Sequence, residues 1–188
     1  MKHMAIFKGN VAPIFPEGVF ILGTYDENGR PDAMNAAWGV QSDYGEISFY
    51  LAEHKTTENL KKTGAFTVAF ATADTVTISD YFGLVSGNKV DKITKAGVHI
   101  SRAPHVNAPV IEEYPVTLEC LVKSYDDKTG ILVGTIVDEI ASESVLTDGK
   151  VDADKLKPIC YDPSIQAYRV LGPVVAKAFS EGRKIIKK

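Results

Sequence analysis

The stretch from Met34 to Gly64 places the strongest constraint on the fold, because a strand pattern runs directly into a helix signal there. The run Ile47-Ser48-Phe49-Tyr50-Leu51 alternates apolar and polar residues and predicts a half-buried β-strand. The motif His54-Lys55-Thr56-Thr57 follows it. Thr56 or Thr57 is a suitable N-cap for a short helix over about Thr57–Thr63, which Gly64 can end in the left-handed conformation.

This strand-to-helix junction has the composition of an anion site. One cation from Lys55, two threonine hydroxyls and the free N–H groups of a helix N-terminus can together seat a phosphate. The alternative is an ordinary capped helix that binds only water. Upstream, Asn35-Ala36-Ala37-Trp38 offers small side chains and one aromatic ring, so a flat ligand could lie against the backbone there.

The N-terminal half predicts an antiparallel meander. Asn28-Gly29 is a strong hairpin signal between a buried strand at Val19–Thr24 and a partner strand at about Asp32–Val40. A turn then leads to the strand at Ile47–Leu51, so the Asn35–Trp38 segment is expected in the middle strand.

The remaining chain predicts further strands with few short helices. The expected strands are Ala65–Phe70, Val116–Ser124, Ile131–Ile140 and Ile165–Leu171. The expected helices are Thr75–Phe82, capped by Asp74 and ended by Gly83, and Lys89–Ala96, closed by Gly97, with a polar helix-compatible insert at Asp148–Lys157. Residues 98–115 are expected to be a loop. The fold class is therefore mainly β: a β-barrel of six or seven strands with helical crossovers.

Composition favours one compact domain over residues 1–188, with an N-terminal arm at 1–16 and a C-terminal tail at 173–188. A net charge of −3 argues against nucleic acid or a membrane surface as a partner. The N-terminus carries no signal-peptide pattern, and no apolar run is long enough to span a membrane. Cys120 and Cys160 are far apart and are expected to be reduced thiols, which indicates a cytoplasmic protein.

Other chemical motifs are missing from the sequence. The four histidines have no zinc-like spacing, so no metal site is predicted. Neither a glycine-rich phosphate loop nor a G-x-S-x-G elbow occurs.

In combination, three segments resemble a known family. The Met34–Trp38 strand, the motif His54-Lys55-Thr56-Thr57-Glu58-Asn59-Leu60 and the Gly64–Phe70 strand look like the flavin reductase-like, FMN-binding split-barrel proteins, and among these the flavoredoxin-type branch. The resemblance runs from about Val19 to Gly172. It implies a split β-barrel with Greek-key-like connections.

The resemblance also implies where FMN binds. The isoalloxazine ring is expected along Asn35–Trp38 and the phosphate on Lys55–Thr57, although many relatives carry Arg in place of Lys55. The family's Ser-Gly-x-x-x-Asp-Lys element matches the Ser86–Lys92 segment, whose loop reaches toward the flavin; the alternative is a solvated amphipathic helix. The full set expected to bind the cofactor is Asn35, Ala36, Ala37, Trp38, His54, Lys55, Thr56, Thr57, Asn59, Ser86, Lys89 and Lys92.

Two activities fit such a site. One is an NAD(P)H-dependent flavin oxidoreductase, in which NADH or NADPH stacks over the flavin and no protein acid or base is required. The other is a flavoredoxin-type electron carrier with protein redox partners. A haem or other ligand binder on the same barrel is a third alternative, for which His54 is the histidine suitably near. The resemblance further implies a homodimer with FMN near the subunit interface.

Overall fold

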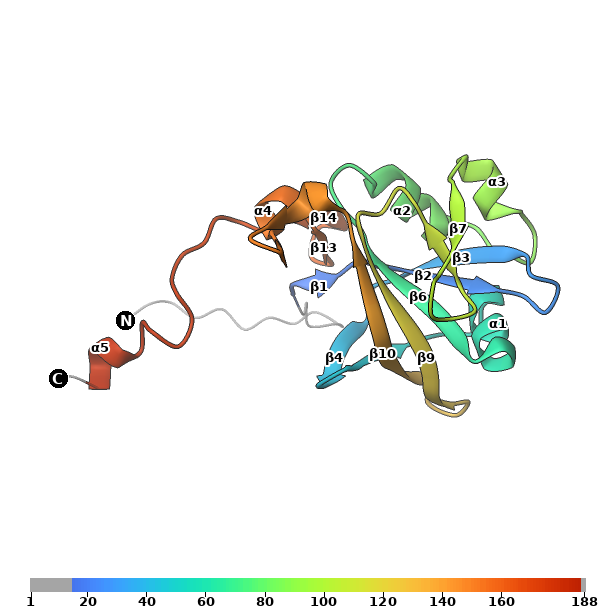
Figure 1. The fold of residues 1–188 in the computed structure, drawn as a ribbon, viewed down its shortest axis with the longest axis horizontal. Coiled ribbons are helices and arrows are strands. Elements are labelled where there is room, and N and C mark those ends of the chain that lie inside the picture. The colour runs from blue at the N-terminus through green and yellow to red at the C-terminus, as the bar shows by residue number, and fades with distance from the viewer. Residues whose placement is uncertain (1–14, 187–188) are drawn as a thin grey trace.

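The computed structural model describes residues 15–186 (Figure 1). The expectations for the rest of the N-terminal arm and for the last residues of the tail lie outside this range. The strands are β1 Glu17–Gly18, β2 Phe20–Tyr25, β3 Pro31–Ala36, β4 Gly39–Asp43, β5 Glu46–Tyr50, β6 Ala65–Phe70, β7 Ile100–Arg102, β8 Pro109–Ile111, β9 Val116–Asp126, β10 Ile131–Ala141, β11 Leu146–Thr147, β12 Lys150–Val151, β13 Ile159–Asp162 and β14 Ala167–Val170. The helices are α1 Lys55–Thr63, α2 Val76–Leu84, α3 Lys92–Ala96, α4 Ala153–Leu156 and α5 Arg183–Ile186, with a 3-10 turn, η1, at Glu143–Val145.

A seven-stranded antiparallel sheet forms the body, in the order β3-β2-β6-β9-β10-β5-β4. β3 and β4 are consecutive in the chain yet lie at opposite edges of this sheet. A chain can join the two edges over so short a distance only if the sheet curls round, so the sheet forms a split barrel (Figure 1). The predicted fold class, mainly β with short helices, is confirmed.

The predicted meander is wrong in one respect. β2 and β3 do pair as a hairpin, with Phe20 opposite Ala36. The expected Asp32–Val40 strand, however, is interrupted after Ala36, and its second part, β4, pairs with β5 instead. The Asn35–Trp38 segment therefore lies where the chain leaves an edge strand, and is not part of a central strand.

The barrel core is formed by inward-facing side chains of β2, β5, β6 and β10. Leu22, Phe49, Phe66 and Leu132 are each at most 1% exposed. Burying a side chain of this size contributes about 1.5–3 kcal/mol relative to leaving it exposed. Gly134 has a packing role here, since a Cβ on it would lie 2.4 Å from the Phe66 ring.

A second apolar cluster lies between the sheet and the elements that cover it. Ile21 and Ala33 of the sheet pack there with Phe82 of α2 and Ile93 of α3. A small sheet in the order β1-β13-β14 adds Ile159. α2 and α3 are thereby held beside β3, where the candidate site lies (Figure 1).

Helix boundaries differ from the sequence expectations by a few residues. α1 begins at Lys55 with His54 as N-cap, so Thr56 and Thr57 lie in its first turn, and Gly64 ends it in the left-handed conformation as predicted. α2 is capped by Thr75, not Asp74, and continues through Gly83. α3 is shorter than predicted because the Asp91 side chain caps it by accepting from the backbone N–H of Thr94.

Several short strands were not predicted. Residues 98–115 contain the β7–β8 hairpin, although a loop was expected there. β13 pairs with both β1 and β14, and β14 lies within the strand predicted at Ile165–Leu171. The Asp148–Lys157 insert contains β12 and the short helix α4.

Beyond β14 the chain extends away from the body toward α5 (Figure 1). The described part of this tail carries exposed apolar side chains, among them Val175 and Phe179 at 96% and 97% exposure. Among the described helices, none has the length and apolar character needed to cross a membrane.

Candidate functional site

The edge position of β3 leaves main-chain groups available to a ligand. β3 pairs with β2 on one side only, and it has no neighbouring strand in the sheet on the other. Edge strands present unpaired N–H and C=O groups. The Asn35 side chain faces α2, where its amide nitrogen donates a hydrogen bond of 2.9 Å to the carbonyl of Ser79. A flat ligand lying against the end of β3 could therefore hydrogen-bond to backbone.

A groove of about 210 Å³ runs along this end of β3. Its walls include the whole Asn35–Trp38 segment together with Tyr50 and His54. The rings of Trp38 and Tyr50 lie 5.5 Å apart between centroids, and the two residues are 61% and 54% exposed. Large aromatic rings left this exposed beside a groove are suited to contact a planar ligand.

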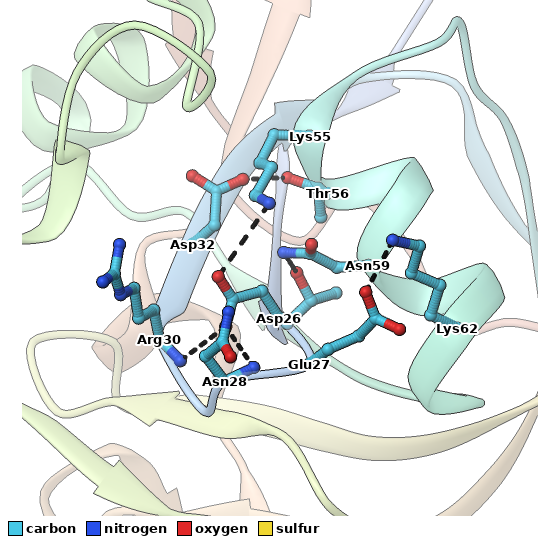
Figure 2. A network of polar contacts seen from close by, with 10 residues as sticks. Asp26, Glu27, Asn28, Arg30, Asp32, Lys55, Thr56, Asn59 and Lys62 are labelled. Carbon is cyan, nitrogen blue, oxygen red and sulfur yellow. Dashed lines mark hydrogen bonds and ion pairs between the residues drawn. The ribbon is translucent and has the colours of Figure 1, made fainter.

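The N-terminus of α1 adjoins this groove. No side chain caps the helix, and the backbone N–H groups of a first helical turn have no intrahelical partner, so the positive end of the helix dipole lies at this junction. Lys55 is partly buried, with its Nζ 3.9 Å from Oδ2 of Asp26 (Figure 2). His54 is exposed and lines the cavities on both sides of the junction.

Three of the expected site residues have internal partners. The Thr56 hydroxyl donates to Oδ2 of Asp32 at 2.7 Å, and the Thr57 hydroxyl donates to the carbonyl of Ala52 at 2.9 Å. The Asn59 amide donates to the hydroxyl of Thr24 at 3.1 Å. All three side chains are buried and anchor α1 to the sheet. With these side chains already bonded, the three residues would help to bind a cofactor through their backbone N–H groups or by holding α1 in position.

The Ser86–Lys92 segment closes the site from the α2–α3 side. Ser86 and Lys92 share a small cavity of about 50 Å³ with Asn35, His54 and Lys55. Lys92 is 4% exposed, and burial lowers the pKa of its ammonium while the Asp32 carboxylate opposes that shift. The structure thus brings the two predicted halves of the site together. Lys89 is exposed and lines an adjoining cavity instead.

Asp32 is the residue that sequence reasoning missed. Its carboxylate accepts the Thr56 hydroxyl (Figure 2). It also lies 3.6 Å from Nζ of Lys92, so it connects β3 to both α1 and α3. Gly87 packs directly on it, since a Cβ there would lie 2.4 Å from Oδ1. In the sequence, the only sign of this role was a charged residue at the start of a predicted strand.

The hairpin turn between β2 and β3 supplies further charge. Oδ1 of Asp26 accepts the backbone N–H groups of Asn28 and Arg30, at 2.8 and 2.9 Å (Figure 2). These hydrogen bonds, the one from Arg30 most strongly, lower the pKa of Asp26, and the Lys55 charge lowers it further. The carboxylate therefore stays ionised beside the α1 N-terminus.

Asn35 and Ala37 also line a second cavity, of about 450 Å³, which was not predicted. The Tyr168 hydroxyl donates to Oδ1 of Asp80 at 2.8 Å in its wall. Burial, together with the Asp80 carboxylate, raises the pKa of Tyr168 to about 12. Two cavities therefore adjoin the end of β3.

The residues described by the structure contain no cluster of three or more histidine, cysteine, aspartate or glutamate side chains able to hold a metal ion. Cys120 is buried and Cys160 half-buried, and both are free thiols, as predicted.

The chain belongs to the flavin reductase like domain family, which it matches over residues 12–161. The predicted family resemblance is confirmed. Membership identifies a flavin-binding protein of the oxidoreductase type. No curated protein matches the chain.

Solved structures of two flavoredoxins are similar over nearly the whole chain. Flavoredoxin of Desulfovibrio vulgaris (Miyazaki F) is 32% identical, with 95% of this chain and 100% of that chain covered and a TM-score of 0.90. Flavoredoxin from Methanosarcina acetivorans is 28% identical, with 97% and 100% covered and a TM-score of 0.88. Nitrilotriacetate monooxygenase component B from Bacillus cereus shares the fold, at 16% identity, 94% and 100% coverage and a TM-score of 0.78.

Proposed function

We propose that this protein binds FMN, with the flavin ring on the end of β3 and the phosphate at the N-terminus of α1. The observation that carries the proposal is the adjacency of the groove at Asn35–Trp38 to the small cavity between Lys55 and Lys92. The edge of β3 offers backbone donors and acceptors to a ring. The two lysines, Ser86 and the helix N-terminus, which has no side-chain cap, offer charge and N–H groups to a phosphate. The residues present therefore fit the group.

Bound flavin supplies hydride and electron chemistry, and the chain's residues bind and orient it. We assign no catalytic acid or base, in keeping with hydride transfer between stacked rings. The exposed Trp38 and Tyr50 rings line the groove, where they are placed to contact the flavin ring. We propose NADH or NADPH as the electron donor, entering where the groove is open.

A flavoredoxin-type electron carrier is the second candidate. It is favoured by the two flavoredoxin structures that match the chain over almost its full length. In this function the chain would retain FMN and exchange electrons with a protein partner. A haem-binding function would depend on His54, which is exposed and lines the groove. Bound FMN and bound haem have different absorption spectra, and the reductase and the carrier differ in which reductant bleaches the bound flavin.

We further propose a homodimer in the cytoplasm. Exposed apolar side chains gather around the groove on β4 and β5 and on the extended tail, as Val40, Tyr50 and Val175 illustrate. Such surfaces are suited to contact a second copy. Light scattering of the purified protein measures its mass directly, and a monomer at all concentrations would contradict the dimer.

The decisive experiment is an absorption spectrum of the protein with FMN, before and after anaerobic addition of NADH or NADPH. Bleaching of a bound-flavin spectrum by either nucleotide supports the reductase. Bleaching only by dithionite or a reduced protein supports the carrier. A protein that binds no flavin contradicts both.

A matched pair of variants tests the proposed phosphate site. Lys55→Ala should weaken FMN binding about tenfold or more, because a charge-assisted contact to phosphate is lost. Lys95→Ala, an exposed lysine on α3 that lines none of these cavities, should leave FMN binding unchanged. Equal retention of FMN by the two variants would rule out the proposed phosphate site.

A further inference from the structure

The cavity of about 450 Å³ that adjoins the end of β3 lies within the size range of small-molecule sites. Its walls come from α2, from the β13–β14 hairpin and from the chain around Val19 and Ala37. Lys55 and Lys92, which line the proposed phosphate site, do not line this cavity. It is therefore a separate space that a second molecule could occupy.

The charged group in this cavity is a carboxylate. Among the nine residues that line it, Asp80 is the only acid, and none is a lysine, arginine or histidine. Within residues 15–186, no basic nitrogen lies within 4.0 Å of the Asp80 oxygens. The Tyr168 hydroxyl donates to Oδ1, and a carboxylate can accept at both oxygens, so Oδ2 can accept from a ligand. Such a group favours a positively charged ligand.

The nearby cation Arg169 does not neutralise this carboxylate. Arg169 follows Tyr168 in β14, so its side chain points to the opposite face of the hairpin. Its Nε donates to Oδ2 of Asp162 at 2.7 Å there. The face of the hairpin that lines the cavity therefore leaves the charge of Asp80 without a cationic partner.

Aromatic rings lie beside the carboxylate. Tyr161 and Tyr168 are directly opposite each other in the β13–β14 pair, which puts their side chains on the same face. Their ring centroids are 6.0 Å apart, with 56° between the planes. Leu84 is 73% exposed and adds apolar surface to the wall. Aromatic faces attract both other rings and cations, so a ligand that combines a ring with a positive charge complements this wall.

We propose that this cavity is a second small-molecule site, for an aromatic amine. The ammonium group binds Asp80, and the ring packs against Tyr161, Tyr168 and Leu84. An aromatic anion is disfavoured because its charge would face Asp80 with no cation in the lining. The site does not depend on FMN, because Asp80 and the two tyrosines line neither the groove nor the small cavity proposed to hold the flavin.

The test measures the binding of benzylamine and benzoate, which share a ring and carry opposite charges at neutral pH, by ligand-observed NMR titration. Wild type should bind benzylamine about tenfold or more tightly than benzoate, because like charges repel. Asp80→Asn should weaken benzylamine binding about tenfold, the loss expected for one charge-assisted contact. The amide oxygen of this variant can still accept the Tyr168 hydroxyl, so folding should be retained.

Two further variants separate the contributions of charge and ring. Asp127→Asn removes an exposed carboxylate of the β9–β10 turn that does not line the cavity, and should bind both probes as wild type does. Tyr161→Leu keeps the charge of Asp80 but removes one aromatic face, and should weaken benzylamine binding about threefold.

Either of two results would overturn the inference and leave the proposed function intact. The first is wild-type protein that binds benzoate as tightly as benzylamine. The second is an Asp80→Asn variant that binds benzylamine as tightly as wild type does. Wild-type protein that binds benzylamine with this Asp80 dependence but binds no FMN would contradict the proposed function and support the amine site.

Discussion

The carboxylate of Asp32 and the ammonium of Lys92 lie 3.6 Å apart, with side chains only 8% and 4% exposed. Asp32 belongs to the edge strand β3, and Lys92 is the first residue of α3. The pair therefore links β3, on which the flavin ring is proposed to lie, to α3, which lies beside the proposed phosphate site. The Thr56 hydroxyl adds the first turn of α1 to the same carboxylate.

Replacing this carboxylate should destabilise the protein. Asp32→Asn leaves Lys92 buried without a counter-charge, and breaking a buried pair from one side costs about 3 kcal/mol or more. Chemical denaturation should show this loss in the free energy of unfolding. The double variant Asp32→Asn/Lys92→Met should recover much of it, because the unpaired charge is removed.

The matched control for this prediction is Asp127→Asn, which removes an exposed partner of Lys61. Exposed ion pairs contribute little, so the control should unfold at the wild-type denaturant concentration. If Asp32→Asn unfolded there as well, the Asp32–Lys92 pair would not be holding α3 against β3.

The contact between Gly87 and Asp32 makes a second prediction. A Cβ at Gly87 would lie 2.4 Å from Oδ1 of Asp32, which is already engaged with Lys92. Gly87→Ala must shift either the carboxylate or the loop, at a cost of about 1–3 kcal/mol. Denaturation and FMN dialysis should both show a loss. Gly172→Ala is the control, since a Cβ there meets no atom within 4 Å, and equal behaviour of the two variants would contradict the prediction.

The sequence was informative about features set by neighbouring residues. The alternation in the Ile47–Leu51 run, the hairpin signal at Asn28-Gly29 and the left-handed end of the helix at Gly64 all depend on local backbone preferences. The structure has each of them close to its predicted place.

Features set by long-range pairing were not predictable in the same way. The edge position of β3 depends on β4 pairing with β5 and on the sheet curling, which no local pattern encodes. The role of Asp32 depends on partners contributed by α1 and α3, far along the chain. The sequence suggested Thr56 as a phosphate ligand because it could not show that the Thr56 hydroxyl already bonds to Asp32.

Trp38 provides a third prediction, which concerns the flavin ring. It is the only tryptophan in the chain, is 61% exposed and lines the groove. Its fluorescence should be solvent-like in the free protein and should be quenched as FMN binds. Riboflavin, which lacks the phosphate, should quench only at higher concentration. FMN that binds in dialysis without altering this fluorescence would place the ring elsewhere.

His105 gives a fourth prediction, about pH. Its Nδ1 lies 3.1 Å from the buried Glu119 carboxylate and 3.3 Å from that of Asp138. The hydrogen bond to Glu119, with added charge from both carboxylates, raises the pKa of His105 above its ordinary value. A pKa raised by folding stabilises the protein below the unfolded value, near 6.5, and this contribution is lost as pH rises through the folded pKa.

The measurement compares wild type with His105→Asn by chemical denaturation across this pH range. The excess stability of wild type over the variant should be greatest in mild acid and should shrink as pH rises, because only the charged imidazole is favoured by the two carboxylates. Asp138→Asn should reduce the pH dependence in part, since Glu119 still faces the ring. A stability difference that stays constant, or grows, with rising pH would mean that His105 is not held in its charged form by Glu119.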